Sequence, residues 1–220
     1  MSSTKLKTAL IICTYNRVEY LWQTLDSLRK LDKEPDYYVI VDDCSTEKDI
    51  KDWIDVFTKQ DNCYAIMKEK RVGIKNSLAF GFDFAFENLH CDIAINLDSD
   101  AIVKPDFISR VVDLKIRYPE QVVSGFNCHH PNNPIVINGD DYVMRKHANG
   151  INMCMDREQY INTVRPNLLK KEGNWDYDST HDKCFVITKP SVVEHIGKES
   201  AMGHIGADVS CDFWHNETSI

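Results

Sequence analysis

The sequence predicts an α/β fold with a mostly parallel central sheet, on three observations. Short apolar runs alternate with amphipathic stretches from residue 7 to residue 117, as in proteins that wind helices around a parallel sheet. Several of these runs stop abruptly in polar clusters, the usual edge of a buried strand. The 220 residues are 43% hydrophobic, which suits a single hydrophobic core.

The first half supplies most of the predicted sheet. Its buried strands are expected at residues 7–13, 37–41, 62–67 and 92–97, where apolar runs are of strand length. Its helices are expected where apolar residues recur at helical spacing, as Leu21, Leu25 and Leu28 do. These helices are residues 18–31, 50–59, 74–88 and 106–117.

The second half is less regular. We expect strands at residues 121–126, 142–146, 151–155 and 184–188 and a helix at 156–164. The prolines and asparagines of residues 127–141 predict a loop. No linker or repeat divides the chain, so we expect residues 1–220 to form one domain, although the sequence also allows it to be part of a longer multidomain protein.

Composition excludes several classes of function. The net charge of −8 argues against nucleic-acid binding, which normally requires a basic face. No apolar run approaches the roughly 18 residues of a membrane-spanning helix, and residues 1–7 do not resemble a secretory signal. Eight cysteines without a Cys-x-x-Cys pair suggest small core residues in a reducing, cytoplasmic compartment.

Three polar clusters follow predicted strands directly: residues 13–17 (CTYNR), 42–45 (DDCS) and 96–100 (NLDSD). Ligands of open parallel sheets gather at the carboxyl ends of the strands. Asp98 and Asp100, spaced by one residue, offer the hard oxygen ligands that Mg²⁺ or Mn²⁺ prefers. The alternative is that such aspartates only end a strand and cap the next helix, and the same alternative holds for Asp42 and Asp43.

The segments IICTYNR (11–17), VDDCS (41–45), RVGIKNSLAFGFDFA (71–85) and NLDSDAIVKPDF (96–107) together resemble glycosyltransferase family 2 and its relatives with the GT-A fold. The resemblance spans residues 7–117 and implies a Rossmann-like nucleotide half, followed by a smaller acceptor half over residues 118–220. It implies that a nucleotide sugar contacts Cys13, Thr14, Asn16, Arg17, Asp42, Asp43, Asp98 and Ser99. Within that set the resemblance implies that Asp43 accepts from a uracil-type imide and that Arg17 lies near the pyrophosphate, and it implies that Asp100, outside the set, binds the metal together with Asp98.

One departure from the family pattern concerns the helix that begins after Gly73. The family often has a Gly-x-x-x-Ala-Arg-Asn-like stretch here, where this chain has Lys75 and Asn76. Both side chains are polar at a helix start. They either face the donor or form an ordinary helix N-terminus.

The second half is expected to supply the catalytic base. Asp176 is the first candidate and Asp178 the second, because carboxylates near aromatic residues can deprotonate an acceptor hydroxyl while a ring stacks on the sugar. In an extended segment the two carboxylates share one side. The alternative is a surface turn.

Several histidines are candidate ligands. The late loop with His195 resembles the GT-A loop in which a histidine joins the metal shell. His204 is a weaker candidate for the same role. His129 and His130 are candidates for contact with the acceptor.

The sequence is therefore interpreted as a metal-dependent glycosyltransferase with bound Mn²⁺ or Mg²⁺. The expected reaction moves a hexose from a UDP-sugar, or next from a dTDP-sugar, to a hydroxyl of a glycan or other acceptor, with inversion. Two alternatives remain: a nucleotidyltransferase, although the first strand lacks the Gly-rich loop expected there, and a non-catalytic domain that only binds a nucleotide sugar.

Overall fold

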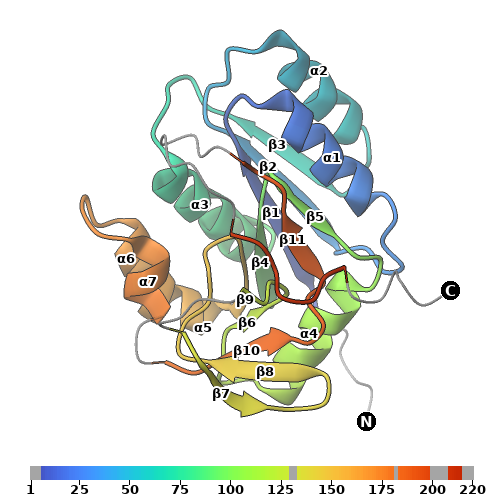
Figure 1. Cartoon of the computed structure of the whole chain (residues 1–220). Coiled ribbons are helices and arrows are strands. Elements are labelled where there is room, and N and C mark those ends of the chain that lie inside the picture. The colour runs from blue at the N-terminus through green and yellow to red at the C-terminus, as the bar shows by residue number, and fades with distance from the viewer. Residues whose placement is uncertain (1–5, 129–132, 181–182, 199–207, 215–220) are drawn as a thin grey trace, which may run out of the picture.

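A nine-stranded sheet runs through the computed structural model, which describes residues 6–128, 133–180, 183–198 and 208–214 (Figure 1). Its strand order within the described residues is β3-β2-β1-β4-β9-β6-β10-β8-β7. The strands are β1 Thr8–Thr14, β2 Tyr37–Asp42, β3 Cys63–Met67, β4 Ile93–Asp98, β6 Val123–Ser124, β7 Ile135–Asn138, β8 Tyr142–Arg145, β9 Asn152–Asp156 and β10 Phe185–Thr188. A separate two-stranded sheet pairs β5 Ala101–Val103 with β11 Val193–His195.

The first four strands of the large sheet are parallel, as the sequence predicts. β1 is central and buried along its length. Leu10 and Ile12 belong to one hydrophobic cluster, whereas Ala9, Ile11 and Cys13 belong to the cluster on the other face. A strand covered on both faces needs apolar residues at every position, which explains why the run does not alternate with polar residues.

Helices cover both faces of the sheet. One face packs against α1 Val18–Leu28, α2 Lys48–Phe57 and α4 Phe107–Arg117. The other packs against α3 Ile74–Asp83, the π-helical turn η1 Phe84–Asn88, and a chain of short helices (Figure 1). These short helices are α5 Arg157–Gln159, the π-helical turn η2 Tyr160–Val164, α6 Arg165–Leu168 and α7 Trp175–Thr180.

Three expectations for the second half differ from the structure. Residues 127–141, expected to be a loop, contain β7, an edge strand that pairs antiparallel with β8. The Asn- and Pro-rich composition is outweighed here by backbone pairing with the neighbouring strand. The segment 174–178 was expected to be extended or a turn, and most of it lies in helix α7. The strand expected at 121–126 shrinks to the two residues of β6.

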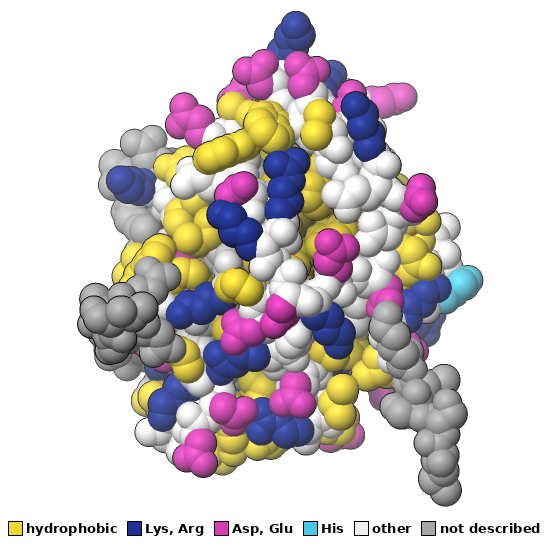
Figure 2. Space-filling model, turned by 90° about the vertical axis from the view of Figure 1, so that its right-hand side faces the viewer, with side chains coloured by type: hydrophobic (Ala, Val, Ile, Leu, Met, Phe, Trp, Pro, Cys, Tyr) yellow, Lys and Arg dark blue, Asp and Glu magenta, His cyan; other side chains and the backbone are white. Residues whose placement is uncertain are grey.

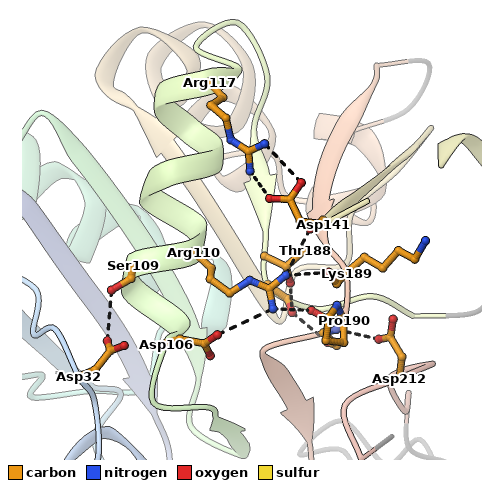
Figure 3. Close-up of polar contacts among 12 residues, drawn as sticks. Asp32, Asp106, Ser109, Arg110, Arg117, Asp141, Thr188, Lys189, Pro190 and Asp212 are labelled. Carbon is orange, nitrogen blue, oxygen red and sulfur yellow. Dashed lines mark hydrogen bonds and ion pairs between the residues drawn. The ribbon is translucent and has the colours of Figure 1, made fainter. Parts of the chain in front are cut away.

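Arginines of α4 tie the two halves together (Figure 3). Arg110 donates to the backbone carbonyls of Lys189, Pro190 and Asp141 at 2.8, 3.2 and 3.2 Å. Arg117 forms an ion pair with the Asp141 carboxylate. Arg110 thereby anchors the connection from β10 to β11, the strand that ends at His195, and Arg117 holds the residue before β8.

Two general features complete the description. Across the described residues, no helix combines the length and apolar character required to cross a membrane. All eight cysteines are free, and Cys13, Cys91 and Cys154 are buried, whereas the other five are partly or fully exposed. The interpretation of the cysteines as core residues therefore holds for three of them.

Candidate active site

The carboxyl ends of β2, β1 and β4 lie side by side in the centre of the sheet. Thr14 is in register with Asp42, and Cys13 is in register with Asp98. The strand order reverses between β1 and β4, which is the switch point where open α/β sheets bind ligands. The three polar clusters of the sequence therefore meet at one crevice edge.

The turn after β1 is held in an unusual backbone conformation by the loop after β2. Asn16 and Arg17 have φ angles of 53° and 62°, in the left-handed region. The Asn16 amide oxygen accepts from the backbone N–H of Thr46 at 2.8 Å, and the Glu47 carboxylate accepts from those of Arg17 and Val18, both at 3.1 Å. Asn16 is thus occupied in shaping the turn, and the turn presents the Arg17 side chain to the site.

Two buried oxygen atoms at the ends of β1 and β2 have no partner among the described residues. They are Oγ1 of Thr14 and Oδ1 of Asp42. The second Asp42 oxygen accepts from the backbone N–H of Ser45 at 2.9 Å, which fixes the carboxylate. A buried polar atom without a hydrogen bond costs about 1–3 kcal/mol, so such atoms at a ligand crevice indicate a polar ligand.

Asp43 has a different position from its neighbour. Its two carboxylate oxygens accept from the backbone N–H groups of Val72 and Gly73, both at 2.8 Å. Gly73 has a φ of 85° and precedes α3, so Asp43 holds the entry to that helix. The predicted contact of Asp43 with a base stays a prediction, and the structure gives this carboxylate a clear structural role.

Asp100 lies between a guanidinium and an imidazole. Its Oδ2 accepts from Arg17 Nη1 at 2.9 Å and from His195 Nε2 at 3.2 Å. Burial opposes ionisation of Asp100, but the hydrogen bond and charge of His195, with the charge of Arg17, lower its pKa. Asp100 raises the pKa of His195 in return, against the lowering effect of burial. The three side chains form an ion-paired cluster.

The small sheet brings His195 to this cluster. β11 pairs with β5 so that His195 is in register with Ala101, the residue after Asp100. The Ile196 N–H donates to the Asp100 carbonyl at 2.9 Å, which continues the pairing. A Cβ on the nearby Gly197 would lie 2.2 Å from Asp100 Oδ2, so the backbone passes closer to the carboxylate than any side chain permits.

The side chains at the site include atoms of the types that bind a divalent metal, namely carboxylate oxygens and an imidazole nitrogen. Burial, followed by the negative charge of Asp100, raises the pKa of Asp98 well above its usual range, despite the opposing charges of His195 and Arg17. A buried carboxyl pair of this kind is neutralised by a cation. Within the described residues, no group of three or more His, Cys, Asp or Glu side chains is arranged so that it could hold a metal ion by itself. Asp98, Asp100 and His195 are donors of the types that Mn²⁺ or Mg²⁺ takes, but they are not preassembled as a metal site, and Asp100 Oδ2 contacts both Arg17 and His195.

Asp176 is linked to the end of β4 through the turn that contains Gly150 and Ile151. Its Oδ2 accepts from the Gly150 N–H at 3.0 Å, and the carbonyl of the next residue, Ile151, accepts from the Asp98 N–H at 3.0 Å. Burial raises the pKa of Asp176, although its bonds to the backbone N–H groups of Gly150 and Tyr177 lower it. A carboxylate with a raised pKa beside a crevice has the character of a general base.

The environment of Asp176 corrects two expectations. Trp175 is buried against Gly150 and belongs to the core, so its ring is not an acceptor wall. Asp178 is two residues further along a helix rather than a strand, so the two carboxylates point to different sides. Asp178 is exposed and lies beside Gly173. Its catalytic role stays a prediction that the geometry does not favour.

The remaining residues that were predicted to contact the donor mostly have structural roles. Asn76 is exposed and donates to the Val72 carbonyl at 2.9 Å, in its own helix start, while Lys75 is half-buried. The Ser99 carbonyl accepts from the Thr24 hydroxyl at 2.9 Å, which ties the turn to α1. Cys13 is buried, and burial followed by the charge of Asp98 raises the pKa of its thiol, so it is a neutral neighbour. His129, His130 and His204 lie outside the described residues.

Sequence reasoning missed several residues near the site. Lys68 directly follows β3, and its charge acts on Cys13. The expectation that ligands gather at the carboxyl ends of parallel strands, applied to β3, would have identified Lys68. Arg71 stacks on Tyr15, with the guanidinium 4.0 Å from the ring centroid. Asp208 accepts from the Asn149 amide at 2.8 Å and acts electrostatically on Asp176 and His195, a relationship that no sequence pattern signals.

Comparisons with known proteins agree on the fold. The family model described as Glycosyl transferase family 2 matches residues 9–184. No curated protein matches the chain. A structure of GalNAc-T7 with UDP, GalNAc and Mn²⁺ is similar at a TM-score of 0.71 and 14% identity, covering 89% of this chain and 45% of that one.

Two further structures are similar. One is S. aureus TarS 1–349 in complex with UDP-GlcNAc, with a TM-score of 0.60, 15% identity, and coverage of 86% of this chain and 57% of that one. The other is the mannosyltransferase PcManGT from Pyrobaculum calidifontis with GDP-Man and Mn²⁺, with a TM-score of 0.57, 14% identity, and coverage of 84% and 57%. The chain thus spans about half the length of the structures it matches, and the predicted GT-A fold is confirmed.

Proposed function

The chain belongs to glycosyl transferase family 2, and on this basis we propose that it transfers a hexose from a nucleoside-diphosphate sugar to an acceptor hydroxyl. The observation that carries the proposal is the meeting of Asp98, Asp100, Arg17 and His195 at the switch point of the sheet. Their position is where an open α/β sheet binds a nucleotide. The family match decides against the nucleotidyltransferase alternative.

The proposed donor is a UDP-sugar, with a dTDP-sugar next. Uracil and thymine share an imide N–H, which requires a buried acceptor. Asp42 Oδ1 and Thr14 Oγ1 are unpartnered at the adjacent strand ends, so Asp42 supports this role better than Asp43, whose oxygens both hold backbone N–H groups. UDP and UDP-GlcNAc in two of the similar structures favour uridine, while GDP-Man in the third makes guanosine the donor to test against.

The proposed metal is Mn²⁺ or Mg²⁺, held by Asp98, Asp100 and His195. When bound, such an ion neutralises the developing charge of the departing diphosphate. The chain's own part is to supply ionised oxygen donors and to bring Arg17 beside them. Arg17 Nη2 is buried and has no partner among the described residues, so this guanidinium retains a donor for a phosphate oxygen.

Asp176 is the proposed general base, and it leads to direct displacement with inversion. The carboxylate is fixed by Gly150 and shares the turn that meets Asp98. Removal of the proton from an acceptor hydroxyl in the transition state supplies about 10²–10⁴-fold in rate. The acceptor, a glycan or another hydroxyl-bearing molecule, approaches from the second half, where Asp208 adds a further carboxylate.

A donor screen tests the proposal. UDP-, dTDP- and GDP-sugars are incubated with the protein, with and without Mn²⁺. The amount of nucleoside diphosphate released measures both transfer to sugar alcohols and hydrolysis by water. We expect Mn²⁺-dependent release from a uridine donor. Nucleotide binding without any release would support the non-catalytic alternative, and release unaffected by chelation would contradict the metal assignment.

A further inference from the structure

The outer sides of α1 and α2 form a shallow cavity, open to solvent, with a volume of about 470 Å³, which the proposed reaction does not use. This volume lies in the range of about 300–1,000 Å³ that is typical of ligand sites. Apolar side chains gather in the upper part of the molecule in Figure 2, among charged ones. The cavity is lined by Val18, Glu19, Trp22, Gln23, Asp49 and Trp53.

Two tryptophans form the walls. Trp22 comes from α1 and Trp53 from α2, and their rings meet edge to face with centroids 6.4 Å apart and an interplanar angle of 66°. Trp22 is 44% exposed, although indole is among the costliest side chains to leave in water. The core of both helices is built from other residues, Leu21 and Ile50 among them, so burial in this fold does not require either tryptophan.

Two carboxylates complete the cavity, and they carry uncompensated charge. Glu19 and Asp49 lie in the first turns of α1 and α2, where the helix dipole favours a negative charge. Neither has an ion pair or side-chain hydrogen bond among the described residues. No lysine or arginine lines the cavity. A helix-start role explains the acidic residues alone, but it does not explain the exposed indoles beside them.

Other aromatic rings of the chain are contacted by its own cationic side chains. In six described contacts a lysine or arginine of the chain lies over a tyrosine or phenylalanine ring, as Arg71 does over Tyr15. Tryptophan attracts cations more strongly than either of those rings. Within the described residues, Trp22 and Trp53 nevertheless have no cation over them. The strongest cation-binding rings of this face are thus left without an internal partner.

We propose that this cavity binds an arginine side chain from a basic segment of a protein partner. Unlike an ammonium, a guanidinium stacks its plane on an indole and donates a fork of N–H groups to a carboxylate. The Gln23 side chain supplies an additional acceptor. The net charge of −8 favours a basic partner. A neutral sugar would leave both carboxylates without a counter-charge, and a lysine ammonium would not cover the ring.

The test uses blocked pentapeptides of glycine and serine with a central arginine, lysine or citrulline. Citrulline has the shape of arginine without its charge. The indole N–H signals of the whole chain are followed by NMR during titration. We expect the signals of Trp22 and Trp53 to shift with the arginine peptide at a Kd on the order of 1 mM, about tenfold more weakly with lysine, and not with citrulline.

Variants then assign the site. Trp22→Ala and the double variant Glu19→Gln/Asp49→Asn should each weaken arginine-peptide binding by about tenfold, since roughly 1.4 kcal/mol of contact is removed. Asp55→Asn, an exposed charge change on α2 outside the cavity, is the matched control and should bind as the wild type does. Melting curves of all variants verify folding.

Three results would overturn the proposal. They are equal shifts with the citrulline peptide, shifts of Trp22 and Trp53 by maltose but not by the arginine peptide, and equal weakening by Asp55→Asn. The first would identify an apolar cleft, the second a sugar subsite, and the third a general effect of the protein's negative charge.

Discussion

Arg17 and Asp100 are joined across 83 residues of sequence by a hydrogen-bonded ion pair of 2.9 Å. Arg17 comes from the turn after β1 and Asp100 from the turn after β4, so the pair links the two strand ends that flank the switch point of the sheet. Burial acts to raise the pKa of Asp100, but the hydrogen bond and charge of His195, followed by the charge of Arg17, lower it.

Asp100→Asn should abolish the Mn²⁺-dependent part of UDP affinity, because an amide oxygen is a weaker metal ligand and carries no charge. Isothermal titration with UDP in the presence and absence of Mn²⁺ measures this. The matched control is Asp106→Asn, a half-buried aspartate directly before α4 whose side chain makes a long ion pair of 3.9 Å with Arg110. Unchanged metal dependence in Asp100→Asn would remove Asp100 from the metal site.

Gly197→Ala tests the close approach of the late loop to Asp100. The added methyl group would lie 2.2 Å from Asp100 Oδ2 and 3.0 Å from Arg17 Nη2, so the cluster must separate. We expect metal-dependent UDP affinity to fall at least tenfold, with loss of about 1–3 kcal/mol of stability from overpacking. Titration calorimetry and thermal melts measure the two effects. Normal affinity would show that the loop moves freely away from the site.

Asp42→Asn and Asp43→Asn should differ in kind. Asp43→Asn replaces one of two acceptors by a donor against the N–H groups of Val72 and Gly73, which costs about 1–3 kcal/mol of stability. Asp42→Asn should chiefly weaken uridine nucleotides relative to guanosine nucleotides. Melting temperatures and competition among UDP, dTDP and GDP separate the two outcomes. A wild-type preference for GDP would contradict the assignment of the base.

Asp176→Asn should lower kcat by about 10²–10⁴-fold while leaving donor affinity intact, because the interaction it removes is made mainly in the transition state. Asp178→Asn is the matched control, since that carboxylate is exposed and points to another side of α7. Steady-state kinetics on both, with donor binding measured separately, compare them. If Asp178→Asn causes the larger loss, the roles of the two residues are reversed.

The pH dependence of transfer should report Asp176 and its neighbour Asp208. A base acts when deprotonated, so kcat/KM falls as the pH drops through the raised pKa of Asp176, at higher pH than for an ordinary aspartate. The negative charge of Asp208 contributes to that rise. Asp208→Asn should therefore move the acidic limb to lower pH, by an amount that salt reduces. Asp140→Asn, an exposed aspartate, should leave the limb in place.

Local sequence patterns predict the parallel half of the sheet and the edge of the sheet that carries the candidate site. Residues 9–13 are apolar at every position and residues 93–97 at all but Asn96, a pattern that is typical of strands covered on both faces. The polar residues that end them, Thr14 and Asp98, follow from the same local signal. A run of apolar residues and the polar residue that ends it are adjacent in the sequence. Buried strands and their ends can therefore be predicted without knowledge of distant contacts.

Which of these polar side chains keep atoms without a hydrogen-bond partner, and which groups face them, depends on the folded arrangement. Asp42 and Asp43 are adjacent and identical in sequence, yet one keeps a free oxygen and the other is occupied by the start of α3. Asp100 meets His195 because two three-residue strands, β5 and β11, pair across some 90 residues. The physical reason is that a side chain's partners depend on pairings distant in sequence, and a local pattern carries no information about which distant segment closes onto it.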